Sequence, residues 1–321
     1  MHQPPAASAP PQAGLHAGAG AGRGGSWVKT TLVNLIPPVT LVAVMLFWGL
    51  APEPVVKHPW TLVIAGVAIM VWIQGLEWLF ERHRGWRLNK REFATDIFYV
   101  VLSYTVIAWL SANLAEAPLL SIKQSLGITT AWMKQLPFLA QAAIVLFLIE
   151  FGQYWMHRLM HNWYPLWLTH APHHHITQLN ALKGAVGNPI ELFLISLSVV
   201  ALFDFDQTAI FCALNMMGVI SGFAHANVRS DPPLFYSFLF TTIRHHSLHH
   251  TALSYEDTRC NYGNSLIVID RMFGTYRDGE SAIVGQDERK RLSIYEQFMF
   301  PFQPLIERIK SARSGSAPAP S

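Results

Sequence analysis

An apolar run leads directly into two histidines in the stretch Leu148-Ile-Glu150-Phe-Gly-Gln-Tyr-Trp-Met-His157-Arg-Leu-Met-His161. No proline interrupts this stretch, so one helix is expected to carry both histidines one to two turns beyond a membrane-spanning segment. Residues four apart share a helix face, so His157 and His161 present two imidazoles side by side. Neutral imidazole is a good ligand for iron, zinc and copper, and the stretch therefore predicts a metal site at the end of a membrane helix.

Further histidine boxes follow downstream. Eleven of the fifteen histidines lie between positions 157 and 250, and the later ones form HAPHH from His170 and HHSLHH from His245, with His225 between them. An HxxHH spacing presents three imidazoles at neighbouring positions of a helix. Eight or more imidazoles are too many for one ion, so the pattern predicts a site for two metal ions.

The composition is that of a membrane protein. Hydrophobic residues make up 51% of the chain, charged residues make up 13%, and the mean hydropathy is positive, which is too apolar for an ordinary soluble domain. Residues 1–26 are rich in Ala, Gly and Pro and lack the apolar core of a secretory signal, so a disordered tail that stays on the mature protein is expected there. Residues 311–321 form a similar second tail. A net charge of +3 without a basic stripe gives no sign of nucleic-acid binding.

The chain has only two cysteines, Cys212 and Cys260. They are too few for an iron–sulfur cluster or a zinc finger held by this chain alone, and they give no sign of a disulfide framework. The glycines near the N-terminus follow no strand and open no helix, so a dinucleotide-binding fingerprint is missing as well. Electrons for a redox reaction at the metals would have to come from another protein.

Four apolar stretches approach the roughly 20 residues that a helix needs to cross a bilayer. They are Thr31–Leu50, Trp60–Phe80, Ile97–Leu114 and Leu136–Phe151. A further apolar segment, Pro189–Ala224, is interrupted by Asp204 and Asp206. Its two halves suit a re-entrant or interfacial hairpin better than two full spans.

Basic residues in the short loops set the expected orientation. The segment 82–91 holds five Lys or Arg residues, whereas the loop after the first span holds only Lys57 and the loop before the fourth holds Lys123 and Lys134. The 82–95 loop is therefore expected in the cytoplasm, on the same side as the N-terminus, the histidine boxes and the C-terminal region. The sequence thus predicts an all-α integral membrane bundle of about four spans with a cytoplasmic, helical, histidine-rich cap.

Proline shapes the expected start of the helix in the second box. Pro172 lies between His170 and His173, and proline is tolerated in the first turn of a helix but not deeper. A helix is therefore expected to begin near Ala171, with His170 at its cap.

The three boxes in this order, together with four spans, resemble the fatty acid hydroxylase/sterol desaturase superfamily of membrane di-iron oxygenases. The resemblance extends to Asn261-Tyr-Gly-Asn264 and Ile269-Asp-Arg-Met-Phe-Gly-Thr275, which are similar to the family's NYG and W-D-x-x-F-G-T stretches, and to Glu150 at the family's acidic position before the first box. It covers roughly Glu77–Tyr276. The chain departs from the family pattern at Ile269, where Trp is usual, and at Pro172, and neither position is an expected ligand.

The resemblance implies two iron ions and a set of ligands for them. The implied ligands are His157, His161, His170, His173, His174, His246, His249 and His250, with His225 as a ninth. His245 and His175 are extra histidines, and each could be a further ligand, hydrogen-bond to a ligand or contact solvent. For Asn261 and Asp270, hydrogen bonds to ligand histidines and capping of turns in a Gly-rich loop are equally open.

The implied reaction is hydroxylation of a lipid C–H bond, with O₂ as co-substrate and two electrons from a ferredoxin-type donor. Apolar helices behind a site at the membrane face suit a lipid that enters from the bilayer. Lipid or sterol desaturation by the same site stays open. A zinc hydrolase is disfavoured because no histidine is followed by the Glu of HExxH. A non-enzymatic metal transporter is disfavoured because the boxes lie outside the spans.

An acyl chain or an aminolipid such as an ornithine lipid is the expected substrate. The Ala/Gly/Pro tail and the lack of a fused cytochrome b5-like domain look bacterial, which disfavours sterols and predicts location in the bacterial inner membrane. The expected organisation is a tail at 1–26, N-terminal spans at 27–136, a fatty acid hydroxylase-like catalytic domain at 137–280 and a cytoplasmic C-terminal segment with its tail at 281–321.

Overall fold

The computed structural model describes residues 27–286 and 289–314, and the regular structure in these ranges is helical. Strand-type pairing within them is limited to two isolated bridges, Glu81 with Val228 and Thr251 with Val284. The prediction of an all-α fold is confirmed. The tail expected at 1–26 lies outside the described residues.

Five helices are long and apolar enough to cross a membrane, by length and composition. They are α1 (Trp27–Leu50), α3 (Thr61–Leu79), a composite helix Lys90–Ser125, α7 (Phe138–Asn162) and α10 (Gln207–His225). The first four correspond to the four predicted spans, and α7 runs from the fourth span through the first histidine box as one helix. The fifth arises from the second half of the predicted hairpin.

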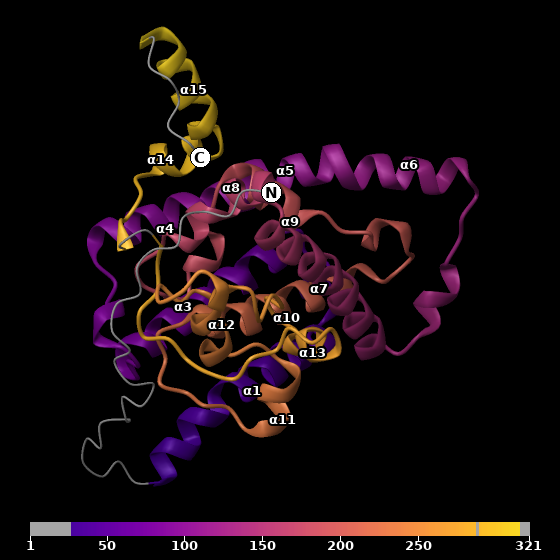
Figure 1. The fold of residues 1–321 in the computed structure, drawn as a ribbon. Helices are drawn as coiled ribbons and strands as arrows, with labels where there is room; N and C mark the ends of the chain where they lie inside the picture. Colours follow the sequence, from indigo (N-terminus) through magenta and orange to yellow (C-terminus); the bar gives the residue numbers. More distant parts are fainter. Residues whose placement is uncertain (1–26, 287–288, 315–321) are drawn as a thin grey trace.

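The remaining elements are short. The composite helix consists of α4 (Lys90–Leu102), a π-turn at Ser103–Ile107, α5 (Ala108–Ser111), a π-turn at Ala112–Glu116 and α6 (Ala117–Ser125). The other helices are α2 (Glu53–Val56), α8 (Tyr164–His174), α9 (Pro189–Ser196), α11 (Leu234–Leu239), α12 (Ile243–His249), α13 (Ile267–Met272), α14 (Ile294–Met299) and α15 (Gln303–Ser314). Figure 1 shows α4–α6 along one side of the bundle and α15 extending away from it. The first residues of the predicted C-terminal tail belong to α15, and 315–321 lie outside the described residues.

Helix α10 is the central element of the bundle, because it packs against α1, α3 and α7. Its inner face includes Val219 and Ile220, which are fully buried. Gly222 brings α3 close, since a Cβ at this position would lie 2.7 Å from Cδ1 of Ile73. Close van der Waals packing of this kind holds helices together in a bilayer, and it positions the end of α10 that carries His225.

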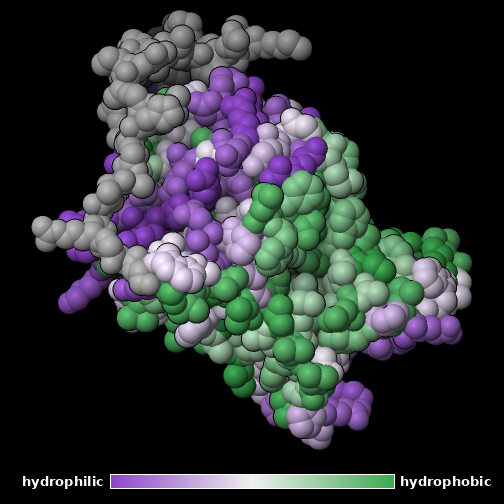
Figure 2. All heavy atoms as spheres, turned by 90° about the horizontal axis from the view of Figure 1, so that it is seen from below, coloured by the Kyte–Doolittle hydropathy of each residue, from purple (hydrophilic) through white to green (hydrophobic). Residues whose placement is uncertain are grey.

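The outer surface of the long helices is apolar. Trp78, Trp109 and Leu114 are 75%, 63% and 60% exposed. Figure 2 shows hydrophobic residues covering one part of the surface in green and hydrophilic residues gathered at another in purple. Apolar exposure on this scale is expected of helices in lipid rather than in water. The chain is therefore an integral membrane protein.

The segment Pro189–Ala224 forms a hairpin that starts and finishes at the histidine end of the bundle, defined as the end where α7 and α10 terminate. At its apex the Asp204 carboxylate accepts hydrogen bonds from Lys123 Nζ (2.6 Å), in the last turn of α6, and from the Thr130 backbone N–H (2.8 Å), between α6 and α7. The apex therefore lies at the opposite end of the bundle. The chain reverses at this apex as predicted, but its returning arm α10 is one helix about 28 Å long, long and apolar enough to cross a membrane, which the expectation of a re-entrant or interfacial hairpin did not include.

Helix α8 begins earlier than the proline rule predicted. It starts at Tyr164, with Pro165 in its first turn and Pro172 inside it. The expected start near Ala171 was wrong because Pro165 takes the first-turn position that suits proline. Pro172 is tolerated because the helix ends two residues later, where the His175 N–H still closes the last turn on the Ala171 carbonyl (3.0 Å).

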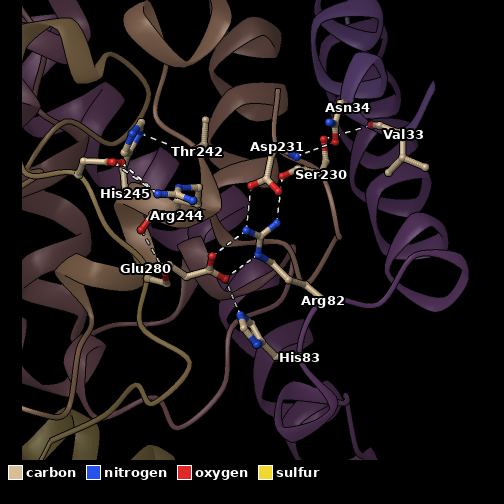
Figure 3. Close-up of polar contacts among 12 residues, drawn as sticks. Val33, Asn34, Arg82, His83, Ser230, Asp231, Thr242, Arg244, His245 and Glu280 are labelled. Carbon is tan, nitrogen blue, oxygen red and sulfur yellow. Dashed lines mark hydrogen bonds and ion pairs between the residues drawn. The ribbon is translucent and has the colours of Figure 1, made fainter. Parts of the chain in front are cut away.

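A buried arginine joins three loops at the histidine end (Figure 3). Arg82 donates to Glu280 through Nε (2.6 Å) and to Asp231 through Nη2 (2.9 Å), and His83 Nε2 lies 2.7 Å from Glu280 Oε1. Burial alone would raise the pKa of Glu280, but the hydrogen bonds and charge of Arg82 and His83 outweigh it and hold the pKa well below 4.5. A depressed pKa means that this contact stabilises the fold above about pH 4.5 and that the effect is lost as the pH falls below it.

Reporter fusions after Asn89, Ser125 and Gly279 test the orientation. We expect cytoplasmic signals after Asn89 and Gly279, because basic residues hold the 82–91 segment inside and the hairpin returns to the same end. The fusion after Ser125 should report the opposite side of the membrane. A non-cytoplasmic signal at Gly279 would mean that segment 189–224 crosses only once and that the predicted sidedness of the histidines is wrong.

Candidate metal centre

Nine buried histidines form two groups at the histidine end of the bundle. Within each group the candidate ligand nitrogens lie within 4.8 Å of one another. The five-histidine group consists of His157, His161, His170, His174 and His249, and the four-histidine group consists of His173, His225, His246 and His250. The fold thus brings together all nine histidines that the family resemblance implied as ligands.

Four helices deliver these histidines from their C-terminal ends, namely α7, α8, α10 and α12. Free carbonyls at a helix C-terminus carry partial negative charge, which favours a bound cation. The box spacing sorts the residues between the groups. His170 and His174, four apart on α8, face the first group, whereas His173 is rotated towards the second.

Backbone carbonyls fix the ring orientation of several histidines. The Nδ1 atoms of His157, His173 and His249 lie 2.6–2.8 Å from carbonyl oxygens of Tyr262, Val186 and Cys260. A carbonyl oxygen only accepts, so each Nδ1 carries the proton and each Nε2 presents its lone pair. His225 makes the same type of bond, to the Ser221 carbonyl at 2.8 Å.

The lone pairs face one another inside the cluster. His170 Nε2 lies 3.0 Å from His157 Nε2 and 3.1 Å from the Nε2 atoms of His161 and His174. Nε2 of His249 is buried with no hydrogen-bond partner among the described residues. The carbonyl bonds at Nδ1 make the Nε2 atoms of His157 and His249 lone-pair acceptors, and a buried lone pair without a donor is costly. A cation between them removes that cost, so the donor set fits a metal ion.

Burial keeps the imidazoles neutral. It lowers the pKa of His170 to about 3. It also holds the pKa values of His174, His249 and His250 well below 6.5, and the neighbouring imidazoles add to the effect. Neutral imidazole is the form that binds a metal.

Two buried carboxylates hold the loop that supports the first box. Asp270 accepts hydrogen bonds from the backbone N–H groups of Tyr262 (2.8 Å) and Gly263 (2.7 Å). Glu150 accepts one from the N–H of Ser265 (2.8 Å). The same loop supplies the carbonyl that orients His157. Asp270 therefore contacts the loop backbone rather than an imidazole.

The other predicted supporting residues lie at the edge of the centre. The Asn261 side chain bonds the carbonyls of His245 and Arg277 at 3.0 and 2.9 Å. The His245 ring packs against Tyr276, and burial lowers its pKa to about 4. His175 Nδ1 lies 3.3 Å from the Lys290 carbonyl. Neither extra histidine belongs to a ligand group, and the supporting roles of these residues stay predictions.

Glu191 is a residue of the centre that the sequence analysis missed. Its Oε1 lies 2.6 Å from His170 Nδ1, so it orients this ring as the carbonyls orient the others. Burial raises the pKa of the Glu191 carboxyl to about 8. The available signal was Asn188-Pro189-Ile-Glu191, an N-cap, a first-turn proline and a third-position Glu, which form a capping box at the start of α9.

A buried lysine positions the segment between α8 and α9. Lys183 Nζ donates to Asp96 Oδ1 (2.6 Å) and to Glu92, both on α4. The next residue, Gly184, approaches His225 so closely that a Cβ would lie 3.2 Å from its Cε1. The ion pairs thus hold this segment against the four-histidine group. The same segment carries the carbonyl to which His173 is hydrogen-bonded.

A cavity of about 60 Å³ adjoins both histidine groups. Histidines from the two groups form one side of it. Gln153 on α7, Leu192 and Ile195 on α9, and Tyr262 and Asn264 of the supporting loop line the rest. The metal centre therefore faces a small space with mixed apolar and amide walls.

Comparison with known proteins gives a family match and several relatives. Residues 142–275 match the family described as fatty acid hydroxylase. The ornithine lipid hydroxylase OlsE of Rhizobium tropici is 28% identical over 62% of this chain and 63% of its own length. The Delta(7)-sterol-C5(6)-desaturase of Nicotiana tabacum is 27% identical over 72% and 87%. An alkylglycerol monooxygenase of Danio rerio is 27% identical over 48% and 33%.

The matched region thus spans less than two thirds of the hydroxylase OlsE and about a third of the alkylglycerol monooxygenase. No solved structure matches the chain significantly.

A bundle of apolar helices that ends in two groups of buried histidines defines a class of membrane proteins with a histidine-rich metal centre. The family match covers α7 through the loop after α13, which carry the nine histidines. The family match and the relatives support the fatty acid hydroxylase/sterol desaturase superfamily that the resemblance predicted.

Substitution of Glu191 tests its role in orienting His170. We expect Glu191→Ala to weaken binding of one ferrous ion by about 10- to 100-fold, because the ring loses its hydrogen-bond acceptor. Glu191→Gln keeps an acceptor oxygen and should lose less. Competition with a calibrated chelator measures the affinity, and Glu116→Ala, at an exposed position on the membrane helices, is the control. Unchanged affinity in Glu191→Ala would contradict the role.

Proposed function

We propose that this protein is a membrane di-iron monooxygenase that hydroxylates a C–H bond of a lipid, with O₂ as co-substrate and two electrons from a separate donor. The observation that carries the proposal is the pair of neutral, buried histidine groups beside a cavity at the end of a membrane bundle. Iron is the metal that the family implies, and a pair of iron ions supplies the O₂ activation that attack on an unactivated C–H bond requires.

The chain's own residues would bind the metal ions, orient the ligand rings and keep bulk water away from the reacting carbon. The nine histidines supply neutral nitrogen ligands, and the carbonyl bonds to Nδ1 hold those rings rigid. The four-helix junction is buried, which keeps bulk water from the reacting carbon. Packing of α7 and α10 holds the two groups at a fixed separation.

A lipid is the substrate that the surroundings favour. The cavity wall from α9 is apolar at Leu192 and Ile195, and Ile190 on the same helix is 40% exposed on the lipid-facing surface. Among the relatives, one is named for ornithine lipid and another for alkylglycerol. We propose an acyl chain or an aminolipid such as an ornithine lipid as the substrate.

Desaturation is the second candidate, because one relative is named as a sterol desaturase and the same centre would serve both reactions. A non-enzymatic metal transporter is less well supported, since the described histidine groups gather at one end of the bundle instead of along a path through it. The proposed catalytic domain is 137–280. The proposed location is the bacterial inner membrane, with the histidines facing the cytoplasm and a ferredoxin-type donor on that side.

Metal analysis of the purified protein tests the di-iron centre. We expect close to two iron ions per chain, because nine imidazoles in two groups exceed the needs of one ion. His249→Ala should lower the content in the five-histidine group and His173→Ala in the four-histidine group. His58→Ala, at an exposed position in the loop after α1, should keep full content. A single zinc ion, with activity indifferent to iron chelators, would overturn the proposal.

Isotope labelling tests the reaction. The purified protein alone should be almost inactive, because it carries no cysteine cluster to supply electrons, and a ferredoxin with its reductase should restore turnover. The new hydroxyl should carry oxygen from ¹⁸O₂ and none from H₂¹⁸O. Label from water would exclude an oxygenase. A product that lost two hydrogens and gained no oxygen would identify the protein as a desaturase.

A further inference from the structure

An unsatisfied hydrogen-bond acceptor lies in the wall of the cavity beside the metal centre. Gln153 is one helical turn before His157 on α7 and is 9% exposed. Its Nε2 donates to the Ile195 carbonyl (3.2 Å). Its Oε1 is buried and has no partner among the described residues. The Ile195 carbonyl can only accept, so the amide nitrogen must face it and the free end is the oxygen.

A second amide lies across the cavity on the supporting loop. Asn264 Oδ1 accepts a hydrogen bond from Ser221 Oγ (3.1 Å). Asn264 also lines the cavity, and its amide group can donate as well as accept. The cavity wall therefore offers one unpaired acceptor, from Gln153, and a second amide, from Asn264.

The rest of the wall limits what these amides can bind. Leu192 and Ile195 are apolar, the histidines are neutral, and the carboxylate of Glu191 is engaged by His170. A cationic headgroup would find no free carboxylate in this wall and would be repelled by the proposed iron ions, whereas a neutral polar group would be satisfied. A secondary amide matches best, because its N–H donates and its carbonyl accepts.

We propose that this cavity binds the amide group of an amide-linked lipid, with Gln153 accepting from the N–H and Asn264 donating to the carbonyl. This inference rests on the proposed lipid hydroxylase function and narrows its substrate class. The reacting carbon then lies close to the amide linkage, within reach of the metal centre, and not in the middle of an acyl chain. An ester-linked lipid keeps the carbonyl contact but leaves Gln153 Oε1 unpaired.

The test compares two short-chain lipids that differ only in an N-acyl amide and an O-acyl ester. Calorimetry measures their binding to the full-length, iron-loaded protein in nanodiscs of neutral lipid. We expect the amide to bind about tenfold more tightly, the effect of one neutral hydrogen bond in a buried site. Gln153→Met should weaken only the amide, so that the two lipids bind alike. Gln124→Met, the same change at an exposed position on α6, should keep the preference.

Asn264→Ala gives an independent signature. It should weaken the amide and the ester by the same factor, because both carry the carbonyl that Asn264 would contact. The iron content of each variant is measured alongside, since a loss of metal would explain weaker binding of both lipids but not a change in their ratio. Equal binding of the two lipids to the unaltered protein, or a preference that survives Gln153→Met, would overturn the proposal.

Oxygen labelling in the same preparations separates this inference from the proposed function. Oxygen incorporated in the middle of an acyl chain, without any preference for the amide, would contradict the amide site and still agree with the proposed hydroxylase function. A preference for the amide without oxygen incorporation would support the amide site and contradict the proposed hydroxylase function.

Discussion

The structure depends on one electrostatic constraint, the convergence of nine buried imidazoles at one end of the bundle. His170 Nε2 faces three other Nε2 atoms at 3.0–3.1 Å. Burial disfavours protonation of these rings, so a bound cation is well suited to satisfy their lone pairs. A metal ion bound here would also stabilise the polar cap, because it would join the four helix ends that meet at the site.

Other residues of the polar cap hold the imidazole rings in the orientation that points Nε2 into the cluster. Each Nδ1 bond reaches a segment that is itself anchored elsewhere. The carbonyl that holds His157 belongs to a loop fixed by Asp270, and the carbonyl that holds His173 belongs to the segment fixed by Lys183. These anchors are buried polar groups with most of their partners inside the protein, so they define a single arrangement more sharply than apolar packing would. The apolar helices beneath them set only where the four ends meet.

Helical periodicity predicts which histidines of a box share a face, and the fold brings together the nine that the family resemblance implied as ligands. The spans could also be predicted, since their length and composition follow from the bilayer. Glu191 could not be singled out, because a lone carboxylate at a helix start is usually a cap, and only the fold shows that its second oxygen reaches His170. The start of α8 was missed for a related reason: two prolines competed for one first-turn position, and the sequence rule was applied to Pro172 instead of Pro165. The depth of the hairpin depended on Asp204, whose partners Lys123 and Thr130 are distant in sequence.

The position of the centre at the end of the bundle has a chemical consequence. Helices α7 and α10 carry their histidines at the last turns, where the apolar surface gives way to the polar cap. A site deeper in the bundle would be walled by aliphatic side chains alone and would suit the methylenes of an acyl chain. At the boundary the wall includes Gln153 and Asn264, and the lipid atoms at this depth are those near the headgroup linkage. On the proposed function, the depth of the site would therefore select the part of a lipid that reaches the metal centre.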